Sequence, residues 1–272
     1  MTAPFGPARP FVKWVGGKRS IIEPLLARLP ARMDAYYEPF LGGGAVFFAL
    51  ANEHRVRSAH LSDANERLVT TYKAVRDDVE AVIALLRRHA RLTSKGHFYR
   101  VRERLNSGRL DEAQTAAALI YLNKTCFNGV WRVNGDGAYN VPWGHHKRPY
   151  VPDEDGLRAA SVALAHATIS HREFDATPVD PAGFYYLDPP YDATYAGYSK
   201  DGFGPEAHER LADWTEKLDA ADAHWLLSNA DTPFVRRLYE GRAIEVVESR
   251  RTVSRSAAGR GTVGELLIAP AA

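Results

Sequence analysis

The order of the expected elements predicts an α/β fold: a mainly parallel sheet interrupted by a helical, basic insertion. Short apolar runs of strand length alternate with helical patterns near both ends of the chain. A glycine-rich turn at 41–44 joins a strand to a helix, and residues 66–123 have helical spacing without a clear central strand. Alternating β and α elements form parallel sheets that bind ligands at the carboxyl ends of their strands. We therefore expect one sheet that is assembled from two separated parts of the chain.

The first part of the chain reads as helix, strand, turn, helix and strand. Ser20 and Glu23 have the spacing of a capping box, and apolar residues follow at helical positions (Ile21, Ile22, Leu25, Leu26 and Leu29). Residues 35–40 are expected to form a strand and 45–51 the next helix. A second strand ends with residues 60–62, directly before Asp63.

The remaining chain divides into the insertion and a second α/β part. Residues 128–150 are rich in Gly, Asn and aromatic residues, and the Asn-Gly-Asp-Gly sequence at 134–137 is typical of a hairpin turn. Later strands are expected at 183–187, 224–228, 243–247 and 265–268. The predicted division is 1–65 and 153–272 for the catalytic domain, with 66–152 as the insertion.

Composition excludes several classes of protein. The chain has 272 residues, of which 45% are hydrophobic and 25% charged, as in globular proteins. It contains no apolar run of the ~18–20 residues that cross a membrane, and residues 1–10 lack the apolar centre of a signal peptide. A single cysteine, Cys126, excludes an intramolecular disulfide and disfavours a cysteine-rich zinc site. We expect a cytoplasmic protein.

Basic residues are unevenly distributed although the formal net charge is only +2. Between residues 87 and 109, one acid, Glu103, stands against eight basic residues (Arg87, Arg88, Arg91, Lys95, Arg100, Arg102, Arg104 and Arg109). A second basic cluster contains Arg250, Arg251, Arg255 and Arg260. Clustered charge suits contacts with phosphates, and it equally suits a solvated helix face. Charge alone leaves both readings open.

The segment with the clearest chemistry is Asp188-Pro189-Pro190-Tyr191, directly after an apolar strand. The exocyclic amine of adenine is a poor nucleophile because its lone pair is delocalised into the ring. The Asp188 carboxylate and the Pro189 carbonyl can each accept one N–H bond and so favour a nitrogen with an available lone pair. Pro190 would stiffen the turn, and Tyr191 would stack on an extruded base.

A second candidate site lies at the turn that begins with Glu38 and Phe40 and continues through Gly42. Glycines allow the backbone to approach a cofactor closely, and Asp63 follows Gly42 at the spacing of an acid that binds ribose hydroxyls. Phe47 stands where a dinucleotide fingerprint requires a third glycine, and Glu38 would repel a pyrophosphate. A sulfonium cofactor without phosphates fits better than a nicotinamide dinucleotide.

Two other segments lack the residues that their apparent motifs would need. Residues 13–18 resemble a phosphate-binding loop, but Val12 and Arg19 occupy positions that need Gly and Ser or Thr. Cys126 lies between Thr125 and Phe127 in the insertion, far in sequence from the cofactor turn. A buried thiol is the expected state, and covalent catalysis by cysteine has no support.

Taken together, the motifs resemble those of the DNA adenine methylases of the Dam and DpnM type. The resemblance covers residues 11 to about 268 and includes segments 11–18, 38–44, 121–123, 127–134, 139–144, 188–191, 228–229 and 264–267, in that order. It implies a Rossmann-like methyltransferase sheet, mainly parallel with the last strand antiparallel. The insertion would then be the target-recognition region, made of helices and a DNA-reading hairpin.

The resemblance also implies roles for individual residues. Trp14 and Lys18 would hold the methionine end of S-adenosyl-L-methionine, and Asp188 would contribute to the same site. Glu38, Phe40 and Gly42 would line the cofactor turn, Asp63 would bind the ribose, and Phe174 would lie near the cofactor adenine. Lys13 would reach DNA at the edge of the target, and a loop at 193–203 would close over the flipped base. The residues expected to bind DNA are Lys13, Arg132, Asn140, Pro142, His145, His146 and Lys147.

The function implied is site-specific methylation of adenine N6 in duplex DNA, with GATC as the target that the resemblance suggests. Relatives carry Arg-Tyr where this chain has His145 and His146, and a neutral imidazole cannot reproduce the fork of an arginine. A target other than GATC therefore stays open. Adjacent histidines without an acid at ligand spacing do not indicate a metal site. No obligate protein partner is evident, and a cognate restriction endonuclease is a conceivable partner.

The residues also bear on four rival functions. Cytosine-N4 methylation offers the same amine geometry, but such enzymes more often have Ser at the position of Asp188. Methylases of RNA or free nucleotides usually show Asn there and lack this insertion. A DNA-binding regulator without catalysis would not need an intact Asp188 and Asp63. A nicotinamide oxidoreductase is disfavoured by Phe47 and Glu38.

Overall fold

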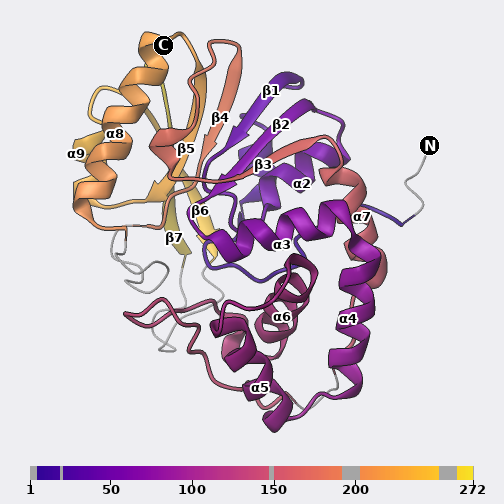
Figure 1. Cartoon of the computed structure of the whole chain (residues 1–272). Coiled ribbons are helices and arrows are strands. Elements are labelled where there is room, and N and C mark those ends of the chain that lie inside the picture. Colours follow the sequence, from indigo (N-terminus) through magenta and orange to yellow (C-terminus); the bar gives the residue numbers. More distant parts are fainter. Residues whose placement is uncertain (1–4, 19–20, 147–149, 192–202, 251–261, 272) are drawn as a thin grey trace.

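The computed structural model describes residues 5–18, 21–146, 150–191, 203–250 and 262–271 (Figure 1). The α-helices are α1 (Ile22–Leu26), α2 (Ala45–Asn52), α3 (Glu66–Asp77), α4 (Val79–Arg91), α5 (Lys95–Asn106), α6 (Glu112–Thr125), α7 (Glu154–Leu164), α8 (Pro205–Ala220) and α9 (Pro233–Leu238). Two 3-10 turns are η2 (Phe127–Gly129) and η3 (Phe174–Ala176). The strands are β1 (Met33–Glu38), β2 (Val56–Asp63), β3 (Ala167–His171), β4 (Gly183–Leu187), β5 (His224–Ala230), β6 (Ala243–Arg250) and β7 (Thr262–Ala269).

Within the described residues, the strands form one seven-stranded sheet in the order β3-β2-β1-β4-β5-β7-β6. The pairs β1–β2, β1–β4, β2–β3 and β4–β5 are parallel, whereas β7 is antiparallel to both neighbours. The predicted fold class, mainly parallel with an antiparallel last strand, is confirmed. Because β1 and β4 are neighbours, the chain must leave the sheet after β3 and return at its centre. This places the ends of β1 and β4 side by side.

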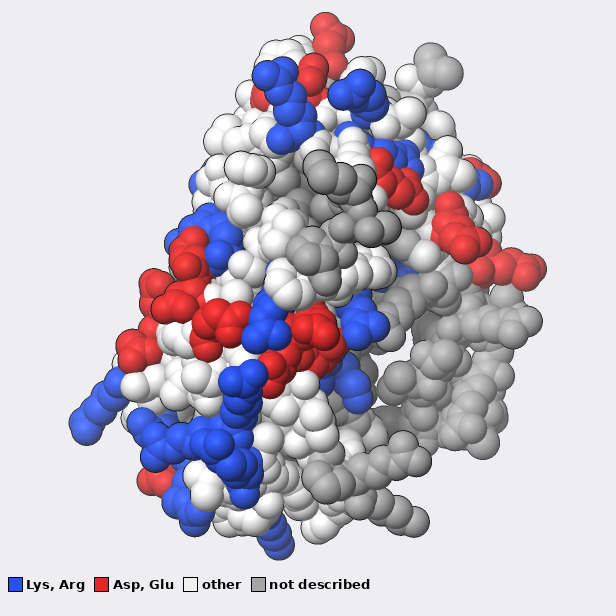
Figure 2. Space-filling model, turned by 90° about the vertical axis from the view of Figure 1, so that its right-hand side faces the viewer, with Lys and Arg blue, Asp and Glu red and all other residues white. Residues whose placement is uncertain are grey.

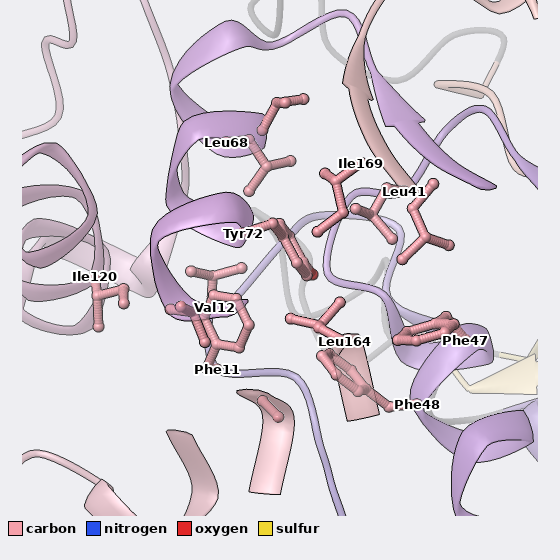
Figure 3. Packing of buried hydrophobic residues seen from close by; sticks show 14 of the residues in the cluster. Phe11, Val12, Leu41, Phe47, Phe48, Leu68, Tyr72, Ile120, Leu164 and Ile169 are labelled. Carbon is pink, nitrogen blue, oxygen red and sulfur yellow. The ribbon is translucent and has the colours of Figure 1, made fainter. Parts of the chain in front are cut away.

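Helices cover both faces of the sheet. In Figure 1, α8 and α9 lie on one side of the sheet and α2, α3 and α7 on the other. On the α3 side, Phe11 packs against the rings of Phe48 and Tyr72 at centroid distances of 6.2 and 4.8 Å (Figure 3). On the α8 side, Trp214 packs edge-on against Tyr185 of β4. The sheet is thus buried on both faces, as parallel sheets require.

The helices of the predicted insertion pack around α6. Its residues 116–123 are all buried, because the alanines at 116–118 allow the other helices to approach closely. The side chains of Asn65, Asp78, Ser94 and Asp111 cap the helices α3, α4, α5 and α6. No helix in the described part of the chain is long and apolar enough to cross a membrane.

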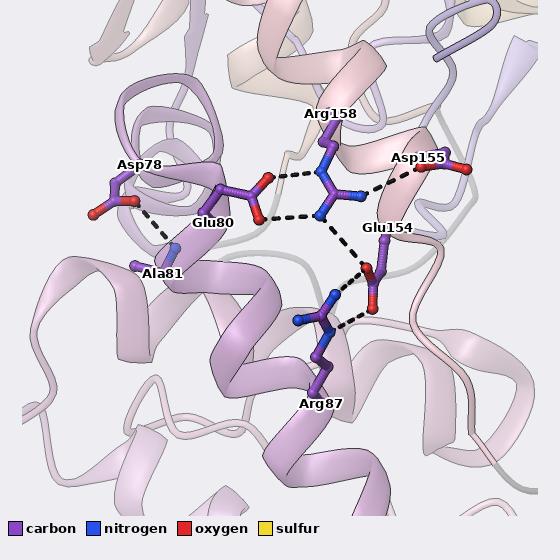
Figure 4. Close-up of polar contacts among 7 residues, drawn as sticks. All are labelled: Asp78, Glu80, Ala81, Arg87, Glu154, Asp155 and Arg158. Carbon is purple, nitrogen blue, oxygen red and sulfur yellow. Dashed lines mark hydrogen bonds and ion pairs between the residues drawn. The ribbon is translucent and has the colours of Figure 1, made fainter. Parts of the chain in front are cut away.

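An ion-pair network joins α4 of the insertion to α7, which precedes β3 (Figure 4). Arg158 pairs with Glu80 at 2.6 Å and with Glu154 at 3.5 Å, and Glu154 also pairs with Arg87 at 2.6 Å. These groups lie at the surface, where solvent and salt weaken each pair. The network therefore contributes little to the free energy of unfolding, and its main effect is to orient α4 against α7.

Three local expectations differ from the structure. Strand β3 was not expected, because its alternating Ala-Thr-Ile-Ser-His sequence is short and half polar. Helix α1 is only five residues long, with Ile21 at its N-cap, so the predicted capping box is wrong in its cap residue; Ser20 lies outside the described residues. The hairpin at 128–150 is held by two isolated bridges, Cys126–Trp143 and Val133–Tyr139, instead of continuous strands.

Basic side chains gather on the insertion. Figure 2 looks at the α4 side of the molecule and shows acidic groups across the middle of this face with Lys and Arg below them. Among the described residues, Arg87 pairs with Glu154, whereas Arg88, Arg91, Lys95, Arg100 and Arg104 make no ion pair. Arg102 instead donates to the carbonyls of Asn140 and Val141 and so supports the hairpin. The clustering is confirmed, while its contact with phosphates stays a prediction.

Candidate active site

The carboxyl ends of β1, β2 and β4 bring together the predicted site residues. Glu38 ends β1, Asp63 ends β2, and Asp188 follows β4 by one residue. Since these strands are parallel neighbours, their ends meet at one edge of the sheet. Pro189 is buried, and Pro190 and Tyr191 are half-buried beside it. Tertiary structure therefore unites residues that stand as much as 150 positions apart in the sequence.

Lys18 is the only cation found among these acids in the described residues. Its ammonium lies 2.6 Å from Asp188 Oδ1 and 3.4 Å from Glu265 Oε1, and it donates to the Gly16 carbonyl at 2.8 Å. It also lies 4.7 Å from the centre of the Tyr191 ring. The Lys18 side chain is 4% exposed, so these contacts replace water almost completely.

Asp188 is held by a second contact from the neighbouring strand. Ser228 of β5 donates from Oγ to Asp188 Oδ1 at 3.1 Å, and the Tyr186 hydroxyl lies 2.9 Å from the same Oγ. Burial raises the pKa of Asp188 to about 6, although Lys18 opposes that rise. Asp188 is therefore mostly ionised at pH 7 and able to accept hydrogen bonds from an amine.

Glu38 lies in the same buried region, and its pKa is shifted further. The Tyr36 hydroxyl donates to Glu38 Oε2 at 2.8 Å, and only 2% of the Glu38 residue is exposed. Burial raises the pKa of Glu38 to about 8, and the nearby charge of Asp188 adds to the rise. Glu38 is thus predominantly protonated at neutral pH, which leaves Asp188 as the charged acid.

The glycine-rich turn is shaped by Asp63 and Trp14. Asp63 accepts hydrogen bonds from the backbone N–H groups of Gly42 at 2.9 Å and Asn65 at 2.8 Å. Burial raises the pKa of Asp63 to about 6, against the effect of these two bonds. Gly42 has a φ of +48°, and a Cβ there would lie 2.9 Å from Trp14 Cδ1. The turn therefore depends on glycine for both its conformation and its contact with the indole.

Aromatic rings gather beside this turn. Phe40 stacks on Phe174 at a centroid distance of 5.3 Å, and Phe203 packs against both rings at 5.7 and 5.9 Å. Phe174 is 2% exposed. The predicted placement of Phe174 near the cofactor adenine stays a prediction, but its packing against Phe40 of the cofactor turn is in keeping with it.

Lys13 is positioned by Asn123, a buried residue of α6. The Asn123 side chain accepts from the Lys13 N–H at 2.7 Å and donates to the Lys13 carbonyl at 2.9 Å and the Gly129 carbonyl at 3.2 Å. The Lys13 side chain is exposed and passes directly over Gly129, whose φ is +64°. One amide thus joins the start of the cofactor motif to the base of the hairpin.

The expected DNA-reading residues lie on the hairpin. Arg132 donates from Nε to Asn140 Oδ1 at 2.7 Å across the two arms, and Arg132, Pro142 and His145 are exposed. His146 lies 3.2 Å from the Cys126 carbonyl and edge-on to Trp143. Lys147 and most of the expected 193–203 loop lie outside the described residues, as does the basic cluster beyond Arg250. Their roles stay predictions.

The geometry bears on two further questions, the reactivity of the Cys126 thiol and the grouping of side chains that could bind a metal ion. Cys126 is fully buried, its Sγ lies 3.5 Å from the carbonyls of Asn123 and Val130, and burial raises the pKa of its thiol. A thiol in this state is a poor nucleophile. Across the described ranges, no three His, Cys, Asp or Glu side chains are grouped closely enough to hold a metal ion.

Two residues at the site, Ser228 and Glu265, were not predicted from the sequence. Both belong to segments that the resemblance included, but neither received a role. An acid inside the apolar run Val-Gly-Glu-Leu-Leu-Ile was the available signal for Glu265, because an inward-facing charge in a strand needs a partner. That partner, Lys18, is 247 positions away and cannot be identified from spacing.

Replacing Gly42 by alanine should damage the cofactor turn. We expect the free energy of unfolding to fall by about 1–3 kcal/mol from the unfavourable φ, and cofactor affinity to fall tenfold or more because Trp14 is displaced. Thermal unfolding and calorimetric titration measure both effects. Gly241→Ala is the matched control, since Gly241 also has a positive φ (+84°) but open space around it. Equal cofactor affinity in the two variants would contradict the role assigned to the turn.

The chain is similar to known DNA methyltransferases over most of its length. The sequence profile of the D12 class N6 adenine-specific DNA methyltransferases matches residues 14–253. A Type II methyltransferase, M.MjaIII of Methanocaldococcus jannaschii, is 36% identical over 90% of this chain and 93% of its own. M1.LlaDCHI of Lactococcus lactis, also a Type II methyltransferase, is 32% identical over 96% and 94%. A DNA adenine methylase of Vibrio cholerae is 33% identical over 95% of each chain. The chain therefore belongs to the D12 class N6 adenine-specific DNA methyltransferase family.

Proposed function

We propose that this DNA adenine methyltransferase uses S-adenosyl-L-methionine to methylate an adenine that has been flipped out of duplex DNA. The observation that carries the proposal is the position of Asp188. Its carboxylate lies at the end of β4, is ionised at neutral pH, and is held by Lys18 and Ser228 through Oδ1. Within the described residues no hydrogen bond reaches Oδ2, which leaves that oxygen for the amine of the base.

The residues around the cofactor turn fit a cationic nucleoside. Asp188 and Glu265 place two carboxylates around the single ammonium of Lys18, so the site has an excess of negative charge that suits a sulfonium. The excess would repel a pyrophosphate. Phe40 and Phe174 would offer an apolar stack to an adenine ring, and Asp63 at the end of β2 would bind the ribose hydroxyls. Trp14 and Lys18 would hold the methionine end.

The bound cofactor would supply an activated methyl group, and the protein would contribute position and charge. Asp188 Oδ2 and the Pro189 carbonyl would each accept one N–H of the adenine amine and direct its lone pair toward that methyl group. Tyr191 would stack on the flipped base. A single in-line transfer needs no covalent intermediate, so the buried Cys126 has no part in it.

DNA would be held by the hairpin and the basic surface of the insertion. Flipping a base costs a few kcal/mol of stacking and pairing, which contacts with phosphates and neighbouring bases must offset. Arg132 is exposed on the hairpin and its Nε is oriented by Asn140, a geometry suited to a bidentate contact with guanine. Lys13 would reach the edge of the target from the base of the hairpin.

The same hairpin would select the DNA sequence that is methylated. GATC is one candidate, and the exposed His145, with a φ of +51°, is the feature that favours a different flanking base. Two of the relatives are named Type II methyltransferases, which makes pairing with a restriction endonuclease a second open part of the proposal.

Sequencing the DNA of a host that lacks its own methylation tests the proposal. We expect N6-methyladenine at one short motif after expression of the protein, read by single-molecule sequencing, and none after expression of Asp188→Ala. GATC as that motif would mean that His145 and His146 are tolerated replacements. Soluble protein that binds S-adenosyl-L-methionine but leaves the host DNA unmodified would contradict duplex DNA as the substrate.

A further inference from the structure

Glu265 occupies a position in the site that the proposed mechanism does not use. It lies on β7, the antiparallel strand next to β5, and is 7% exposed. Its side chain is on the same face of the sheet as Ser228, because the intervening Leu266 packs on the opposite face with Leu227. It therefore enters the catalytic region from the side away from β1.

Among the described residues, the carboxylate of Glu265 makes two polar contacts, and both are with residues that surround Asp188. Its Oε1 lies 3.4 Å from the Lys18 ammonium and accepts a hydrogen bond from the Tyr191 hydroxyl. Lys18 and Tyr191 are themselves in contact, with the ammonium 4.7 Å from the ring centre. Glu265, Lys18 and Tyr191 thus form a closed triangle next to the carboxylate that is expected to receive the adenine amine.

Lys18 is consequently shared between two acids, and its own side chain is only 4% exposed. The shorter distance, 2.6 Å, is to Asp188. A buried ammonium between two carboxylates is attracted by both, so each acid limits how strongly the other is neutralised. If the second acid were absent, the whole charge of Lys18 would act on Asp188, which would become a weaker acceptor for an amine.

We propose that Glu265 is a positioning residue of the methyl-transfer reaction, which holds Lys18 and Tyr191 beside Asp188 and keeps Asp188 from being fully neutralised by Lys18. Among the described residues, it reaches Asp188 only through these two side chains. The proposal rests on the proposed role of Asp188 as the acceptor of the adenine amine.

A pH profile distinguishes this role from a purely structural one. The charged and titratable groups around Asp188 are Lys18 from the N-terminal segment, Glu38 and Tyr36 from β1, Tyr186 from β4, Tyr191 after it and Glu265 from β7. The charge of Glu265 raises the pKa of Asp188. Protonation of Asp188 abolishes its acceptor role, so the rate should fall on the acid side of about pH 6. Removing the charge of Glu265 should move this acid limb to lower pH.

The test is the single-turnover rate of methyl transfer to duplex DNA at saturating S-adenosyl-L-methionine, measured from pH 5 to pH 8.5. Glu265→Gln should lower the plateau rate about tenfold or more and displace the acid limb by about half a unit to one unit toward lower pH. Glu265→Asp keeps the charge but withdraws it from Lys18, so its limb should lie between those of the wild type and the glutamine variant. The matched control is Glu248→Gln, an exposed acid on β6 opposite Gly264.

Each outcome decides the question. The proposal is supported if the acid limb of the rate profile moves to lower pH in Glu265→Asp and further in Glu265→Gln, while Glu248→Gln leaves it unchanged. If one of the two Glu265 variants does not fold, the other alone gives the direction of the shift. A limb that stays in place or moves to higher pH overturns it, as does an equal shift in Glu248→Gln. A wild-type profile without an acid limb would instead contradict the role of Asp188 itself.

Discussion

Asp188→Ala should abolish methylation while leaving the protein folded and able to bind its cofactor. Turnover should fall by at least about 10³-fold, because a group that stabilises charge in the transition state is removed. Lys18 does not become an unpaired buried charge in this variant, since Glu265 stays 3.4 Å from its ammonium. We therefore expect cofactor affinity to change by less than about tenfold, or ~1.4 kcal/mol.

Turnover and cofactor affinity should be measured on the same preparation of the protein. Turnover on duplex DNA gives the rate, and calorimetric titration with S-adenosyl-L-methionine gives the affinity. Asp188→Asn is the matched variant, because it keeps the size of the side chain and one carbonyl oxygen but loses the charge. It should also be severely slowed. Loss of cofactor affinity as large as the loss of turnover would assign Asp188 to binding instead of catalysis.

Glu38→Gln should stabilise the protein without its ligands, and the gain should grow with pH. Glu38 is buried beside Asp188 and has a pKa of about 8, compared with 4.5 for an ordinary glutamate. Between these two values the unfolded chain loses the proton that the folded protein keeps. The folded state binds more protons, so its stability falls as pH rises through this interval. A neutral glutamine of the same shape removes this dependence.

The stabilities of the two proteins should therefore be similar near pH 4.5 and should separate up to about pH 8. Each pKa unit corresponds to about 1.4 kcal/mol, so the separation should reach a few kcal/mol. Denaturant unfolding across this range measures it, and the difference between the proteins cancels the contributions of Asp63 and Asp188, whose pKa values are raised too. A constant difference at all pH values would show that Glu38 ionises normally in the folded protein.

Local sequence patterns were sufficient for most of the sheet. Strand β4 was predicted with its observed limits, since five consecutive apolar or aromatic residues flanked by a turn suit only a strand buried on both faces. The helices of the insertion were expected from their spacing, and the turn at 41–44 from its glycines. Strand β3 was not predicted, because an edge strand with Thr168 and Ser170 has no continuous apolar run. Its pairing with β2, rather than its sequence, makes it a strand.

Some residues of the candidate site were predicted from the sequence and others were not. Asp188 and Gly42 were proposed because the chemistry of each is indicated by its immediate neighbours in the chain, and Asp63 because of its regular spacing from the glycine-rich turn. Glu265 and Ser228 were not, since their function comes from contacts with Lys18 and Asp188 that span 247 and 40 positions. Asn123 similarly acquires its role only when it bonds Lys13.

The sequence by itself determined the class of fold, the order of its parts and the chemical types at the cofactor turn and the Asp-Pro-Pro-Tyr motif, because these depend on residues close together along the chain. Only the tertiary structure decided that Lys18 is shared by Asp188 and Glu265 and that Glu38 is protonated. The physical reason is that charge sharing and desolvation depend on distance and burial in space. Both are created when β1, β4, β5 and β7 meet in one sheet.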